Sequence, residues 1–185
     1  MVRMLRRGAS REPLPDVAER VLETMRGRGA GSYLGAMTDP KKAALGLPLP
    51  VLVLLALLAV PRVVLHDLSV IAPATFVNWL LVVVPPLVWI AVVLIWKVPN
   101  PFVTLLVVGI IYGVLLALGH QLLWGQAFGD DPPTLGGNLS DLAPGAQALI
   151  IRGFSVLSSL VTGTIVGALA GLAALGAQRL LRVRT

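Results

Sequence analysis

The side chains of this 185-residue chain that could do chemistry are a few polar groups beside long apolar segments. Two of them are histidines, which can bind a ligand or act as a general base. Ionisable groups at membrane depth are costly and often functional. The candidate set is Arg62, His66, Asp67, Asn78, His120, Gln121 and Arg152.

The spacing of these residues argues against a metal site, because the two histidines lie on different apolar segments and form no HxxxH-type pattern. The chain has no cysteine, which excludes disulfides, thiolate metal sites and thiol catalysis. It also lacks a phosphate-binding loop, GxSxG, HExxH and a dinucleotide fingerprint. We therefore expect no metal and no cofactor, and we favour a non-enzymatic protein over an enzyme.

The elements that must position these groups are apolar helices. The chain is 56% hydrophobic and 13% charged, with a mean hydropathy of +0.86, which is too apolar for a soluble domain. We predict an all-α integral membrane protein with four transmembrane helices in a domain over 47–178. The predicted spans are 47–65, 76–96, 102–124 and 154–177.

Basic residues predict the orientation of these spans. A polar head over 1–46 carries nine Lys or Arg, Lys97 lies in a short link, and the tail over 179–185 carries three Arg, whereas the links 66–75 and 125–145 carry none. Both termini are therefore predicted to be cytoplasmic in a plasma membrane. Most of the excess positive charge, +6 in total, flanks the apolar spans. We therefore expect the basic residues to contact anionic lipid headgroups and not nucleic acid. The arginine-rich usage is typical of a GC-rich bacterial genome.

Residues 16–26 of the head predict a short amphipathic helix. It either rests on the membrane or bundle, or docks a partner. Its apolar stripe is Val17, Val21, Leu22 and Met25.

Two consecutive prolines, Pro85 and Pro86, interrupt the second span. Trp79 and Trp96 are 17 residues apart, about 25 Å of helix, which nearly matches a bilayer core. We predict one kinked span, with a re-entrant hairpin as the alternative. The apolar region 146–178 is too long for one span, so we predict an interfacial helix over 145–151 and a joint at Arg152–Gly153.

The polar candidates all map to the outer half of the predicted bilayer. Arg62 and His66 share a helical face, and we expect Arg62 or Arg152 to pair with an acid of the outer face, with Asp67 as the first candidate. Two interpretations remain open: structural anchoring and pairing between helices, or a ligand site roofed by the 125–145 loop.

Small residues at four-residue intervals predict close helix packing, either within one chain or between copies. They are Gly109 and Gly113 in the third span, and Gly163, Gly167 and Gly171 in the fourth. We expect an accessory or self-associating subunit of a membrane assembly, in contact with lipid and with other subunits or further copies. The alternatives are a small oligomeric transporter or channel with an outward-facing polar site, and an enzyme acting on a lipid-linked substrate.

Overall fold

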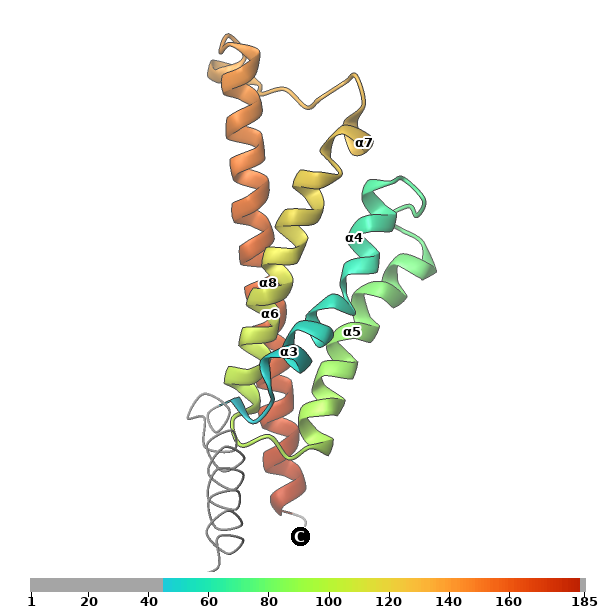
Figure 1. Cartoon of the computed structure of the whole chain (residues 1–185), viewed down its shortest axis with the longest axis vertical. Helices are drawn as coiled ribbons and strands as arrows, with labels where there is room; N and C mark the ends of the chain where they lie inside the picture. Colours follow the sequence, from blue (N-terminus) through green and yellow to red (C-terminus); the bar gives the residue numbers. More distant parts are fainter. Residues whose placement is uncertain (1–44, 184–185) are drawn as a thin grey trace, which may run out of the picture. The chain divides into compact units, whose positions relative to one another are not determined.

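The computed structural model describes residues 45–183, and these residues form helices without any strand (Figure 1). The predicted head helix lies outside the described part of the chain. In chain order the helices are α3 (Leu49–Leu57), α4 (Val60–Asp67), α5 (Phe76–Ile95), α6 (Pro101–Leu122), α7 (Trp124–Phe128), a 3₁₀ turn (Gly137–Leu139) and α8 (Pro144–Val183).

Four helical segments are long and apolar enough to cross a membrane, which confirms the predicted fold class at this level. The segment Leu49–Asp67 comprises α3 and α4, and the others are Phe76–Ile95, Pro101–Leu122 and Pro144–Leu181. Below, the upper end is the end where α4 and α6 finish and α5 begins, at the top of Figure 1. The opposite end is the lower end.

The first segment turns between α3 and α4, at Leu58 and Ala59. Pro61 has no N–H to donate to the carbonyl of Leu57, so the helix is interrupted and a new one starts with proline in its first turn. Just before this turn, the carbonyl of Leu55 accepts a 2.7 Å hydrogen bond from the indole N–H of Trp89 in α5. Trp89 is fully buried, so this bond joins α3 to α5 in the core.

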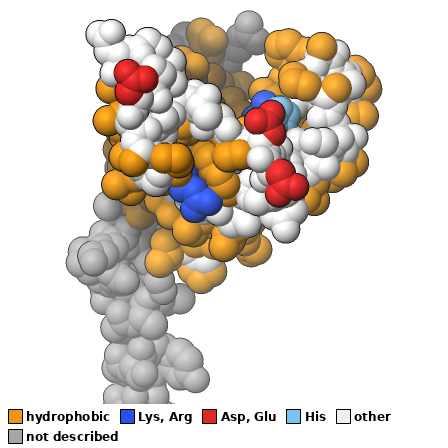
Figure 2. Space-filling model, turned by 90° about the horizontal axis from the view of Figure 1, so that it is seen from above, with side chains coloured by type: hydrophobic (Ala, Val, Ile, Leu, Met, Phe, Trp, Pro, Cys, Tyr) orange, Lys and Arg blue, Asp and Glu red, His pale blue; other side chains and the backbone are white. Residues whose placement is uncertain are grey.

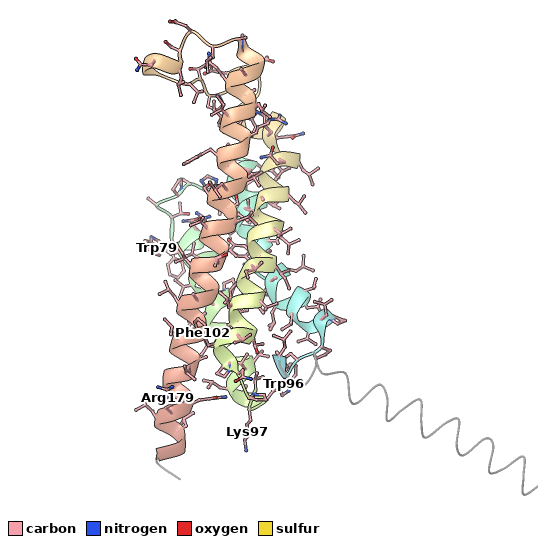
Figure 3. All side chains as sticks on the ribbon, turned by 90° about the vertical axis from the view of Figure 1, so that its left-hand side faces the viewer. Trp79, Trp96, Lys97, Phe102 and Arg179 are labelled. Atoms are coloured by element: carbon pink, nitrogen blue, oxygen red, sulfur yellow. The ribbon has the colours of Figure 1, made fainter. Side chains whose placement is uncertain are left out.

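Helix α5 runs continuously through Pro85 and Pro86. The single-span prediction is confirmed at the level of helix continuity, and the hairpin alternative is wrong. The two prolines deny the carbonyls of Leu81 and Val82 their usual helical partners. Trp79 and Trp96 lie at opposite ends of this helix (Figure 3).

Helix α8 is a single element of 40 residues, so the prediction of a separate 145–151 helix with a joint at Arg152–Gly153 is wrong. A glycine in a helix costs about 1 kcal/mol relative to alanine, but it keeps its N–H and its place in the hydrogen-bond ladder. Gly153 has open space beside it and nothing forces a bend there. The helix therefore continues.

The glycine patterns of α6 and α8 face each other within one chain, which decides between the two packing alternatives. A Cβ on Gly109 would collide with backbone atoms of Gly163 and Gly167, and one on Gly113 would press on Leu160. Farther down, Gly171 packs against Phe102. This is the most extensive helix contact of the bundle, because backbones without side chains approach closely.

At the lower end, side-chain hydrogen bonds tie the helix ends to the connecting segments. The hydroxyl of Thr104 donates to the carbonyl of Leu45 at 2.7 Å, and Gln178 donates to the carbonyl of Val98 at 2.9 Å. Lys97 and Arg179 both lie at this end (Figure 3).

Candidate functional site

The end of α4 places Asp67 at the upper end of the bundle. Ser69 adopts a left-handed conformation (φ 57°), its N–H bonds the carbonyl of His66, and the N–H of Val70 bonds the carbonyl of Leu65 at 2.9 Å. This pair of bonds is the Schellman motif, which ends a helix and satisfies its last carbonyls. Asp67 is consequently the last residue of α4. Its exposed fraction is only 7%.

Asp67 bonds two histidines, and we call these three residues the histidine–aspartate cluster. Nδ1 of His120 lies 2.7 Å from Oδ2 of Asp67, and Nδ1 of His66 lies 3.4 Å from Oδ1. A carboxylate only accepts hydrogen bonds, so the 2.7 Å contact requires the proton of His120 on Nδ1. The Nε2 atom of that ring is then an acceptor in the neutral imidazole.

The expected pairing of Asp67 with an arginine is wrong. Arg62 and Asp67 are five residues apart on one helix and point to different faces. Instead, Nε of Arg62 donates to Oδ1 of Asn78 at 3.2 Å, and the Asn78 amide donates to the carbonyl of Pro73 at 2.6 Å. The histidines supply the partners that the arginines were expected to provide.

Arg152 also has a different partner. Its guanidinium carbon lies 4.8 Å from the ring centroid of Trp124, a cation–π contact. Gln121 donates to the backbone carbonyl of Arg152 at 3.4 Å. The seven candidate residues therefore form three neighbouring groups: the histidine–aspartate cluster, Arg62 with Asn78, and Gln121 with Arg152.

A cavity of about 360 Å³, the upper cavity, opens beside the histidine–aspartate cluster. Its polar side consists of that cluster and two serines of α8, and its apolar side is mainly aromatic. Figure 2, which looks onto the upper end, shows acidic and histidine side chains close together among hydrophobic ones. The aromatic and serine residues are Trp124, Phe128, Phe154, Ser155 and Ser158.

These walls were not predicted as part of a site. Ser155 and Ser158 belong to the small-residue face of the fourth span, yet they line the cavity, whereas the neighbouring Ser159 is 3% exposed and bonds the carbonyl of Ser155. The available signal was the spacing of Phe154, Ser155 and Ser158, which places them on one side of a helix.

The 125–145 loop contributes less to the cavity than expected. Only α7, at its beginning, lines the cavity, and the following loop residues are held against α8 by Gln147. Oε1 of Gln147 accepts from the amide of Leu135 at 2.8 Å, and its amide nitrogen donates to the carbonyls of Ser140 and Leu142 at 3.0 and 2.8 Å.

The arrangement suits hydrogen bonding and proton exchange with a molecule that has a polar group and an apolar body. In the described range 45–183, no three or more His, Cys, Asp or Glu side chains are grouped so that they could hold a metal ion. Comparisons with protein families, curated proteins and solved structures find no match to this chain.

Proposed function

We propose that this chain is a non-enzymatic multipass membrane protein that binds the polar group of an amphipathic molecule in the upper cavity. The observation that carries the proposal is the 2.7 Å bond between His120 and Asp67 at the wall of a cavity with aromatic sides. A carboxylate bonded to Nδ1 fixes the orientation of an imidazole and leaves Nε2 available. Pockets that combine apolar walls with a few placed polar groups are typical small-molecule sites.

The proposed location is the plasma membrane of a bacterial cell, with both termini cytoplasmic and the upper end outside. Support comes from the four apolar helices and from Lys97 and Arg179, which share the lower end, because basic residues concentrate on the cytoplasmic side. Reporter fusions at residues 46, 70, 98 and 135 should alternate between inside and outside. If 70 and 98 report the same side, this topology is refuted.

A neutral hydroxyl-bearing lipid is the probe for the cavity, because a hydroxyl donates to Nε2 and the aromatic walls accept an acyl chain. A photoactivatable monoacylglycerol should crosslink to peptides containing α7 or the Phe154 region in purified full-length protein. His120→Asn keeps an amide donor near the Nδ1 position but removes Nε2, so it should lower crosslinking about tenfold, as expected for one lost hydrogen bond.

Gln126→Ala provides the matched control, since Gln126 is exposed on α7 and does not line the cavity. It should crosslink like the unmodified protein. Equal labelling of all three proteins, or labelling spread evenly over the helices, would refute specific binding.

The second candidate is hydrolysis or transfer on a lipid-linked substrate, with His120 as general base. It is favoured by the oriented imidazole together with Ser155 and Ser158, which line the same cavity and offer hydroxyl groups. This candidate predicts that the protein releases fatty acid from the monoacylglycerol, that His120→Asn abolishes the release and that Gln126→Ala retains it. That result would replace the non-enzymatic proposal. No release with retained crosslinking supports the non-enzymatic proposal.

Membership of a larger assembly is a further part of the proposal. It rests on the docking stripe predicted at residues 16–26, since the glycine groove is filled within the chain. Mass measured in mild detergent tests it, and a monomer with no copurified partner would contradict it. Transport receives less support, because the lower half of the described helices contains no carboxylate or histidine to continue a polar pathway.

A further inference from the structure

A second cavity lies deeper between the helices than the histidine–aspartate cluster, and we call it the deep cavity. Its volume is about 250 Å³, and helices α4, α5, α6 and α8 all contribute to its walls. Arg62, on α4, precedes Asp67 by five residues, about 7.5 Å along the helix axis. On α6, Tyr112 is near the middle of the helix.

Arg62 is the charged group of this cavity, and it forms no ion pair with any acid in the described chain. The ion pairs of the described residues all involve Asp67, which is bonded to the histidines. Arg62 uses Nε to bond the neutral amide of Asn78. Its two Nη groups, which carry the paired donors of the guanidinium, have no hydrogen bond within residues 45–183.

Tyr112 supplies a second hydrogen-bonding group beside the deep cavity. Tyr112 is 6% exposed, its ring packs edge-on against Trp89 at 6.0 Å, and its hydroxyl makes no hydrogen bond to any described residue. Leu81 and Val82, which precede the proline pair, also line the cavity, and its walls apart from Arg62, Tyr112 and Thr162 are apolar. The guanidinium and the phenol hydroxyl thus provide hydrogen-bond donors beside largely apolar walls.

We propose that the deep cavity is a binding site for a carboxylate, held by the Nη groups of Arg62 and the hydroxyl of Tyr112. A guanidinium matches the planar carboxylate with two parallel hydrogen bonds, and such charge-assisted pairs are the strong ones. A single cation in apolar surroundings neutralises a monoanion, whereas a phosphate dianion would leave a buried charge without compensation. Arg62 is half-buried, and a partner group is expected for an arginine that lies among apolar helices.

The size of the cavity suits a short aliphatic acid. A volume of 250 Å³ equals that of roughly eight water molecules at about 30 Å³ each, close to the count of non-hydrogen atoms in a six-carbon acid. The apolar walls, which include the buried ring of Trp89, accept the alkyl chain. This site is independent of the upper cavity and of the function proposed for it.

Bromine quenches tryptophan fluorescence at contact, so 6-bromohexanoate is a direct probe of the deep cavity. In the full-length protein in detergent, it should quench saturably, and Trp89→Phe should remove the saturable component. The neutral 6-bromohexanol reports partition into the micelle and should give only a linear decrease. Arg62→Gln should weaken saturable binding about tenfold or more, the loss expected for hydrogen bonds to a charged group.

Arg152→Gln is the matched control, since Arg152 stacks on Trp124 and does not line the deep cavity. It should bind 6-bromohexanoate like the unmodified protein. If Arg62→Gln does not fold, Arg62→Lys replaces it, and it should bind more weakly because an ammonium lacks the planar fork. Equal quenching by the acid and the alcohol, or unchanged binding in the Arg62 variant, would overturn the proposal.

Discussion

The glycine contact between α6 and α8 predicts that alanine has opposite effects at two kinds of position in the same helix. At Gly163, an added Cβ would collide with the backbone of Gly109 and Gly113, and no flexible side chain is available to move away. At Gly153, in the same helix, a Cβ meets nothing within 4 Å. The chemical change is identical, so the difference between the two variants measures the helix contact alone.

The expected magnitudes follow from two opposing terms. Alanine stabilises a helix by up to about 1 kcal/mol relative to glycine, and this gain applies at both positions. Overpacking typically costs about 1–3 kcal/mol, and only Gly163 incurs that cost because α8 must shift away from α6 there. The free energy of unfolding should therefore differ between the two variants by about 1–3 kcal/mol, with Gly153→Ala the more stable.

Thermal unfolding of the full chain in one mild detergent, followed by circular dichroism, measures this difference. A change of 1 kcal/mol shifts the midpoint by about 2–4 °C in a domain of this size, so a gap of roughly 2–12 °C is expected. Gly176→Ala, which also meets open space, should behave like Gly153→Ala. If Gly163→Ala is as stable as these two controls, the close contact between the helices does not exist.

Three other substitutions test individual contacts. Trp89→Phe should lower the free energy of unfolding by about 1–3 kcal/mol, because the carbonyl of Leu55 loses the indole donor and keeps only the 3.2 Å bond from the N–H of Leu58; an unchanged midpoint would contradict the indole bond. Lys97→Gly should raise the free energy of unfolding by about 1 kcal/mol, because Lys97 has φ 50° at the end of α5, a left-handed conformation that glycine adopts without steric cost. A lower free energy of unfolding would show that contacts of the Lys97 side chain outweigh this strain. Gln147→Ala should speed hydrogen exchange at the amide of Leu135 without changing exchange in α6, and unaltered exchange there would count against the loop anchor.

The local sequence predicts the four long apolar helical segments of the chain. Long apolar segments separated by polar links predict four helices, because hydropathy and helix length are sums over neighbouring residues and need no knowledge of the fold. The continuity of α5 through the proline pair was predictable on the same local grounds, because Trp79 and Trp96 are 17 residues apart, which nearly matches one bilayer core. The predicted break at Arg152–Gly153 is wrong. It assumed that a helix is no longer than one bilayer crossing, but the interior of α8 contains no proline that would end the helix.

Only the tertiary structure decided which side chains meet. Asp67 bonds histidines and not arginines because the rotation of α4 and its crossing with α6 bring His120 to the carboxylate. Likewise, the glycines could serve one chain or two until the antiparallel packing of α6 on α8 filled the groove. Helix faces follow from spacing along the chain, but the partner of a face depends on the rotation and crossing of two helices, and these are set by contacts far apart in the sequence.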